Sequence, residues 1–191
     1  MTRDETTSAP VLVGRGVVLR PPRESDKADR LAIGRHAEYV RLDGGNTRDL
    51  AQLTEDDVAQ WYERITSAQY GWVIDIGGRA VGTTRLKDYD AENRAAEFAI
   101  GIADPALWGR GYGTTTTRLV LRFGFETLAL HRVALIVLAE NPRAQAAYVK
   151  CGFTREGVLR DTVLIDGVWH SDVAMSILED EYRRLAVTWE F

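Results

Sequence analysis

A glycine-rich run after a strand-like segment has the residue types and spacing to bind an anion. It consists of Trp108, Gly109, Arg110, Gly111, Tyr112, Gly113 and Thr114. Alternating glycines leave successive backbone N–H groups accessible, because no Cβ blocks the approach of a ligand. A helical pattern begins at Thr114 and adds unpaired N–H groups and the positive end of the helix dipole. The run predicts a pyrophosphate cradle, although a Gly-rich turn that only reverses the chain has the same composition.

Two common phosphate-binding designs do not fit this run. A P-loop ends in Gly-Lys followed by Ser or Thr, and the sequence contains no Gly-Lys pair. A dinucleotide fingerprint is G-x-G-x-x-G in a first βαβ unit, with an acidic residue about 20 positions later. Here the pattern is G-x-G-x-G past the middle of the chain, and it leads to Ala129, Leu130 and His131 at that distance. The design that remains holds the pyrophosphate of coenzyme A.

A second motif follows the first after a strand-like segment. Residues 141–144 are Asn-Pro-Arg-Ala, and residues 148–153 are Tyr-Val-Lys-Cys-Gly-Phe. In this order and spacing, the two motifs resemble the GNAT acetyltransferases, in particular the branch with the ribosomal-protein N-terminal and spermidine acetyltransferases. The resemblance runs from about Val81 to Leu178, and more loosely back to Leu12. The wider family usually has Gln or Arg where this chain has Trp108, but tryptophan is familiar in that branch.

The resemblance implies a co-substrate and a set of residues that bind it. The co-substrate is acetyl-CoA, and no metal or redox cofactor is needed. Strand amides at Ile100, Gly101 and Ile102 would hold the pantetheine arm, and Asn141, which also suits a helix N-cap, would bond its amide. Arg110 would place a charge beside the pyrophosphate, and Thr114 would offer a hydroxyl. Either of the last two would equally suit an exposed surface or a simple cap.

Two side chains are candidates for proton transfer. A free alkylammonium has a pKa of about 10.4, so an acceptor amine must lose a proton before it reacts. Tyr148 shares a helix face with Ala144 and Cys151, and the resemblance makes it the general acid at the cofactor sulfur; the alternative is a core tyrosine. Glu97 shares a strand face with small residues that leave room for a ligand, so it could act as a base through water. The alternative interpretation of Glu97 is a surface carboxylate paired with Arg94 or Arg85.

The bulk composition limits the classes of partner. The chain has 191 residues, a formal net charge of -4 and 45% hydrophobic residues. This charge argues against a nucleic-acid or anionic-membrane surface, and no apolar run approaches the roughly 20 residues of a membrane span. The N-terminal residues lack the apolar core that a signal peptide has. The single cysteine, Cys151, fits a reducing compartment. We therefore expect a cytoplasmic protein, and the scattered His and Cys residues offer no metal site.

The elements that must position these residues follow the order β-α-α-β-β-β-α-β-α-β-β. This order predicts an α/β protein with the GNAT fold, in which helices flank a mixed, mostly antiparallel sheet. Residues 1–10 are expected to be a disordered lead and residues 11–191 one GNAT domain. The predicted elements are strands at 11–20, 70–76, 80–86, 94–102 and 133–138, helices at 25–34, from 54, at 114–128 and at 142–151, and a final hairpin turning at Asp166-Gly167.

These observations predict an N-acetyltransferase that moves an acetyl group directly to a primary amine. A protein N-terminus is the favoured acceptor, and a polyamine or an amino sugar presents the same nucleophile. A non-catalytic coenzyme A-binding or sensing module is the alternative. Segments 36–50 and 165–172 are expected to contribute to the acceptor site. The sequence does not indicate which of their residues contact one another. The resemblance is also compatible with a homodimer.

Overall fold

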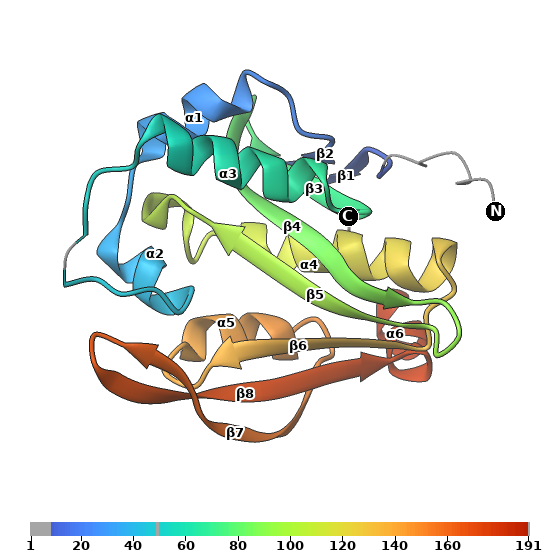
Figure 1. The fold of residues 1–191 in the computed structure, drawn as a ribbon. Coiled ribbons are helices and arrows are strands. Elements are labelled where there is room, and N and C mark those ends of the chain that lie inside the picture. Colours follow the sequence, from blue (N-terminus) through green and yellow to red (C-terminus); the bar gives the residue numbers. More distant parts are fainter. Residues whose placement is uncertain (1–8, 49, 191) are drawn as a thin grey trace.

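The computed structural model describes residues 9–48 and 50–190 and forms one sheet flanked by helices (Figure 1). The strand order is β1-β2-β3-β4-β5-β6-β8-β7, and every neighbouring pair is antiparallel except β5 with β6. The strands are β1 (Leu12–Gly14), β2 (Val17–Arg20), β3 (Tyr70–Ile76), β4 (Arg79–Asp90), β5 (Ala95–Ile102), β6 (Arg132–Leu138), β7 (Thr154–Ile165) and β8 (Val168–Leu178). The α-helices are α1 (Asp26–Ile33), α2 (Ala37–Leu42), α3 (Glu55–Thr66), α4 (Tyr112–Arg122), α5 (Pro142–Val149) and α6 (Glu179–Ala186).

Local sequence signals account for several of these elements. Thr54 caps α3 by accepting from the Asp57 N–H at 3.2 Å, and the Asp57 carboxylate accepts from the Thr54 N–H at 2.9 Å. This reciprocal pair is the predicted capping box. Gly77 and Gly78 join β3 to β4 with φ of 62° and 85°, left-handed values that favour glycine. The predicted fold class and the order of its central elements are therefore confirmed.

The structure differs from the predicted order in four places. The first predicted strand is a hairpin, because Gly16, at φ 71°, reverses the chain between β1 and β2. Helix α2 occupies residues 37–42, where no helix was predicted. The third predicted helix begins two residues early as α4 and continues through a π-helical turn, Phe123–Thr127. Helix α6 was not predicted.

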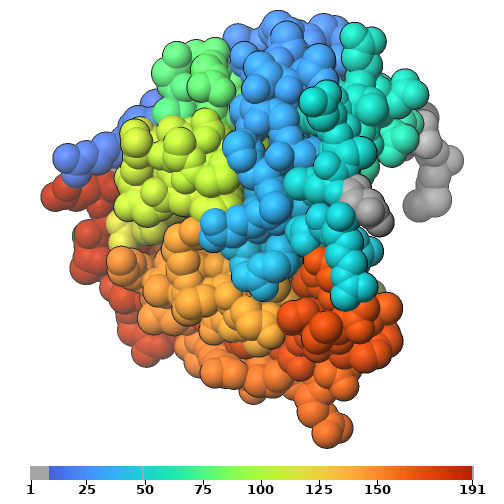
Figure 2. All heavy atoms as spheres, turned by 90° about the vertical axis from the view of Figure 1, so that its left-hand side faces the viewer, coloured from blue at the N-terminus to red at the C-terminus, as the bar shows by residue number. Residues whose placement is uncertain are grey.

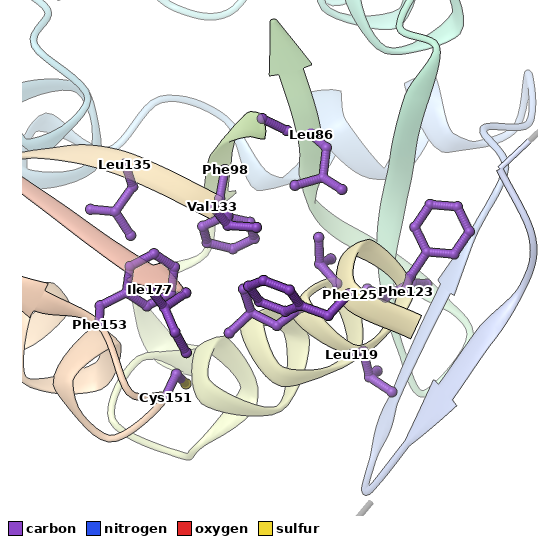
Figure 3. Close-up of a cluster of buried hydrophobic side chains, with 14 of the residues drawn as sticks. Leu86, Phe98, Leu119, Phe123, Phe125, Val133, Leu135, Cys151, Phe153 and Ile177 are labelled. Carbon is purple, nitrogen blue, oxygen red and sulfur yellow. The ribbon is translucent and has the colours of Figure 1, made fainter. Parts of the chain in front are cut away.

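The hydrophobic core lies between the sheet and α4. Figure 3 shows aromatic and aliphatic side chains that meet there from the central strands and the helix; among them are Phe98, Leu119, Phe123, Phe125, Val133 and Ile177. Cys151 belongs to this cluster, and burial raises the pKa of its thiol to about 12. A buried thiol of this kind is unreactive, so Cys151 has a packing role.

A buried ion pair fixes α1 against the sheet. The Arg20 guanidinium donates to both Asp26 carboxylate oxygens, at 2.9 and 2.7 Å, and to Asp75 at 2.8 Å. Paired geometry of this kind offsets the cost of removing the charges from water. Since α2 follows α1 after three residues, this anchor also limits where α2 lies.

The central opening of the molecule comes from β5 and β6. These parallel strands pair only between Ala95–Glu97 and Arg132–Ala134. Beyond these residues β5 continues along β4, and β6 continues along β8, so the two strands diverge (Figure 1). The starts of α4 and α5 lie at this divergence, which positions the glycine run beside the second motif.

The expected lead, residues 1–10, lies mostly outside the described residues. Its last two residues pack onto the sheet: Ala9 is buried, and the Pro10 carbonyl accepts a 2.7 Å hydrogen bond from the Trp72 indole. In the part of the chain that the structure describes, no helix has the length and apolar character to cross a membrane.

Candidate functional site

A pocket of about 400 Å³ lies where β5 and β6 diverge. It brings together all but two of the predicted site residues: Ile100, Gly101, Ile102, Trp108, Gly109, Gly111, Tyr112, Gly113, Thr114, Asn141 and Tyr148. The two exceptions are Arg110, which is exposed beside the pocket, and Glu97. The glycine run, the end of β5 and one face of α5 therefore form a single site.

The glycine run leaves open space beside its backbone. A Cβ at Gly109, Gly111 or Gly113 would meet no protein atom within 4 Å. Gly109 and Gly111 have left-handed φ of 74° and 87°, which favours glycine, but Gly113 lies inside α4 and has no such requirement. Gly113 is therefore explained best by the close approach of a ligand to the backbone.

The start of α4 offers backbone donors to that ligand. Gly111 is the N-cap and has no side chain to cap the helix, so the first-turn N–H groups of Tyr112, Gly113 and Thr114 have no side-chain acceptor, and these three residues line the pocket. Unpaired N–H groups and the helix dipole together attract phosphate oxygens. The residues present therefore fit a pyrophosphate group.

Trp108 and Arg143 form the outer wall beside the glycine run. The Trp108 indole donates a 2.8 Å hydrogen bond to the Ile102 carbonyl, and the Arg143 guanidinium lies 3.9 Å from the centre of the indole ring. Arg143 also lies 3.8 Å from Glu38 on α2. Arg143 was not among the predicted site residues, although it stands in the Asn-Pro-Arg-Ala motif close to Asn141.

Tyr148 lies on the inner wall of the pocket. Asn141 begins α5 by accepting from the Ala144 N–H at 3.1 Å, with Pro142 at the first helical position. The Tyr148 ring packs edge-on against Phe98, with centroids 6.2 Å apart. Its hydroxyl makes no hydrogen bond to any described residue, and burial, with a smaller contribution from Cys151, raises its pKa. The phenol therefore holds its proton at neutral pH.

Glu97 does not join this site. Its carboxylate lies 2.7 Å from the Lys87 ammonium group on the neighbouring strand, and it does not line the pocket. The partner is neither of the arginines that sequence analysis considered; Arg94 pairs instead with Glu179 at 2.8 Å. Further along the same strand, Ile100, Gly101 and Ile102 do line the pocket.

Helix α2 forms the wall opposite α5. The Tyr39 hydroxyl lies over Gly101, so close that a Cβ there would be 2.7 Å from it. Burial, followed by the nearby charge of Asp43, raises the pKa of Tyr39 to about 12. Asp43 supplies the pocket's acidic side chain among the described residues. Desolvation raises the pKa of Asp43, against the opposing charges of Arg64, Arg85 and Arg30.

Hydrogen bonds join the loop after α2 to the β7–β8 turn. The Asp166 carboxylate accepts from the Thr47 N–H at 2.8 Å, the Thr47 hydroxyl at 2.5 Å and the Arg48 N–H at 3.1 Å. The Asp166 N–H donates to the Asn46 side chain at 2.7 Å. The expected acceptor segments 36–50 and 165–172 therefore meet at these residues. Figure 2 shows this face, with the blue segment around α2 between the yellow-green and orange parts of the chain.

His170 lies apart from the pocket. Its Nδ1 is 3.0 Å from the Glu140 carboxylate, and neither residue lines the pocket. The described residues also contain no group of three or more His, Cys, Asp or Glu side chains that could hold a metal ion.

Comparison with known proteins agrees with this architecture. The family model of the acetyltransferase (GNAT) domain matches residues 17–154. Spermidine N(1)-acetyltransferase from Escherichia coli (strain K12) is 33% identical over 111 residues, which are 58% of this chain and 59% of that enzyme. A Bacillus subtilis (strain 168) protein with the provisional name ribosomal N-acetyltransferase YdaF is 31% identical over 126 residues, 66% of this chain and 67% of the relative. The matched segment thus spans less than two thirds of the E. coli enzyme.

A solved structure supports the same assignment. Spermidine N-acetyltransferase from Vibrio cholerae, in complex with CoA and spermine, has a TM-score of 0.72 and 25% sequence identity, with 88% of this chain and 98% of that chain covered. The domain match includes both motifs as far as Thr154, and the strand order places them at one pocket. The chain belongs to the GNAT acetyltransferase family.

Proposed function

We propose that this protein is an acetyl-CoA-dependent N-acetyltransferase that acts on a primary amine. One observation carries the proposal: a single pocket joins the glycine run to the protonated Tyr148 on one side and to Asp43 on the other. Acetyl-CoA, when bound, supplies an acetyl group activated as a thioester. The chain's own residues must then bind it, orient it and move protons.

The glycine run and β5 are assigned to the cofactor. The N–H groups at the start of α4 would hold the pyrophosphate, with Arg110 beside it as an exposed charge. The backbone of Ile100, Gly101 and Ile102 and the side chain of Asn141 line the same pocket further in, where the pantetheine arm belongs. One neighbour of known structure, the V. cholerae enzyme, is in complex with CoA, which supports this choice of ligand.

In this proposal Tyr148 and Glu97 carry out the proton transfers, and Asp43 binds the acceptor. Tyr148 would donate the proton of its hydroxyl to the departing thiolate, because burial keeps the phenol protonated. Asp43 would receive the ammonium group of the acceptor and hold it beside Gly101. Glu97 is bound to Lys87, so in this proposal it accepts a proton only through intervening water.

A peptide or protein N-terminus is the acceptor that we propose. It enters between α2 and the β7–β8 turn, the two segments that Asp166 joins. One relative is named for spermidine and another is, by name, a ribosomal N-acetyltransferase. Both names describe transfer to nitrogen, so the acceptor has to be determined on this chain.

Substitution of Tyr148 by phenylalanine tests the mechanism. Tyr148→Phe should lower kcat by about 10²- to 10⁴-fold, the usual contribution of a general acid. Its affinity for coenzyme A should stay near that of the wild type, because the ring still packs on Phe98. Tyr70→Phe, which removes a hydroxyl distant from the pocket, is the matched control. Thiol release and calorimetric binding of coenzyme A give the two readouts, and unchanged turnover would remove Tyr148 from the mechanism.

A further inference from the structure

A second hollow, of about 350 Å³, shares no lining residue with the pocket described above. It is formed by the C-terminal end of α3 and by β4, and its charged lining residues are Arg64, Arg85, Lys87 and Asp88. Asp88 is exposed at the point where β4 leaves its register with β5. The mechanism above uses none of these residues.

Strand register places this hollow on the same face of the sheet as the acceptor side of the pocket. Arg85 lies opposite Gly71 on one neighbouring strand and opposite Ala99 on the other. Cross-strand partners point to the same face. A Cβ on Gly71 would meet the Ile65 side chain of α3 at 2.8 Å, so α3 covers that face. Gly101, under Tyr39, is two residues from Ala99 in β5 and so faces the same way.

The charges in this hollow are only partly balanced. Lys87 is paired with Glu97 at 2.7 Å. Among the described residues, neither Arg64 nor Arg85 has a carboxylate within ion-pair distance. Both arginines act at longer range on Asp43, which the proposed function assigns to the ammonium group of the acceptor. The acidic residue of the hollow, Asp88, is exposed and forms no ion pair with either arginine.

We infer that Arg64 and Arg85 form a subsite for a carboxylate of the acceptor, so that the preferred acceptor is a peptide N-terminus with an acidic side chain close behind it. This inference rests on the proposed function. Guanidinium groups suit it because they bind carboxylates through paired hydrogen bonds. A polyamine carries further ammonium groups in place of a carboxylate, and the two arginines would repel them.

Strand spacing indicates which residue of the acceptor peptide would contact the two arginines. Positions two residues apart in a strand are about 7 Å apart, so Arg85, opposite Ala99, lies about that far along the sheet from Gly101. An extended peptide covers about 3.3–3.6 Å per residue. With the amine beside Gly101, the acidic side chain belongs to the second or third residue of the acceptor.

Matched peptide amides test this subsite by binding, without reference to turnover. The peptides Ser-Glu-Ala-Ala, Ser-Gln-Ala-Ala and Ser-Lys-Ala-Ala, each with an amidated C-terminus, are titrated calorimetrically into the protein saturated with coenzyme A. The Glu peptide should bind about 10- to 100-fold more tightly than the Gln peptide, the range of a hydrogen bond to a charged group, and the Lys peptide should bind weakest. The preference should shrink as salt is raised.

Variants connect that preference to the two arginines. Arg85→Gln and Arg64→Gln should each reduce the ratio between the Glu and Gln peptides, while coenzyme A affinity, measured in parallel, shows that the variants are folded. Arg184→Gln removes one exposed charge from α6, outside both hollows, and should keep the wild-type ratio.

Each outcome bears on a separate claim. Equal binding of the Glu and Gln peptides, tighter binding of the Lys peptide or of spermidine, or an unchanged ratio in both arginine variants would overturn the subsite. A strong preference for the Glu peptide without any acetylation of it would support the subsite and contradict the proposed function. Acetylation of neutral and acidic peptides at equal efficiency would support the proposed function and contradict the subsite.

Discussion

Asp43 is the residue whose environment is hardest to explain without a ligand. Desolvation raises its pKa, against Arg64, Arg85 and Arg30, while Tyr39 also faces it from α2. A carboxyl group with a raised folded-state pKa ionises less readily in the folded protein than in the unfolded chain. Its effect on stability is therefore unfavourable, and stability is lost as the pH rises through the folded-state pKa. A side chain kept at such a cost is a candidate for function.

Asp43→Asn should therefore separate stability from activity. We expect thermal stability at pH 7 equal to or above that of the wild type, and kcat/KM for the acceptor about 10- to 100-fold lower, because a charged partner of the ammonium is lost. The acidic limb of the pH–rate profile should also change, since protonation of Asp43 weakens acceptor binding in the wild type. Thermal unfolding and pH–rate profiles measure the two effects. Lower stability with an unchanged profile would show that Asp43 is structural.

Some contacts of single residues could not be predicted from the sequence. The alternation of a strand predicted the face of Glu97, but it did not identify Lys87 as the cross-strand partner, because register is set by the whole sheet. Asp43 lies in a loop whose position depends on Asp166, more than a hundred residues away. Contacts of that range leave no periodic signal in the sequence.

Substitutions at the start of α4 can separate an effect on ligand binding from an effect on folding. Gly113→Ala adds a Cβ in open space and replaces glycine in a helix, a change that favours the helix by roughly 0.5–1 kcal/mol. We therefore expect a protein of equal or higher thermal stability that binds coenzyme A more weakly. Gly113→Val should weaken binding further.

Thermal unfolding without ligand and calorimetric titration of coenzyme A measure these two effects. Gly157→Ala, which also adds a Cβ in open space but on β7, is the control and should bind coenzyme A normally. Normal coenzyme A affinity in both Gly113 variants would contradict the cradle.

Elements with a strong local signal were predicted, and those without one were missed. The α3 capping box, the Gly77-Gly78 hairpin and the helix start at Asn141-Pro142 all depend on neighbours a few residues apart. Helix α2 has six residues and no side-chain cap, so it depends on tertiary contacts such as that of Tyr39 with Gly101. Helix α6 consists mostly of charged residues, and Tyr182 is its one buried side chain. Its sequence pattern therefore resembles that of an exposed segment.

At the scale of the whole molecule, Asp166 connects the two segments between which we propose that the acceptor enters. The bonds from Thr47 and Arg48 lower the pKa of Asp166. The stabilisation that these bonds give is present above the unfolded-state pKa, about 3.9, and is lost as the pH falls through the lower folded-state value. The tether therefore holds at neutral pH.

Asp166→Ala should release this tether. We expect a higher KM for the acceptor, unchanged affinity for coenzyme A, and faster amide hydrogen exchange over residues 43–48. Asp180→Ala, an exposed acidic residue on α6, is the control. Unchanged exchange and KM would mean that the loop holds its position without Asp166.

The pocket itself is a property of the whole sheet. Sequence motifs named most of the residues that line the proposed cofactor side, because family resemblance and local structure coincide there. The acceptor side depends on the divergence of β5 from β6 and on the docking of distant loops, so only its segments could be named. The homodimer suggested by the resemblance stays a prediction.

Product analysis tests the central claim most directly. The purified protein is incubated with acetyl-CoA and either the N-terminal peptides above, spermidine or an aminoglycoside, and the acceptor is examined by mass spectrometry alongside thiol release. The account predicts saturable release with one acetyl group on the nitrogen of a peptide N-terminus. Tight binding of coenzyme A without acetylation of any acceptor would contradict it and support a coenzyme A-sensing module.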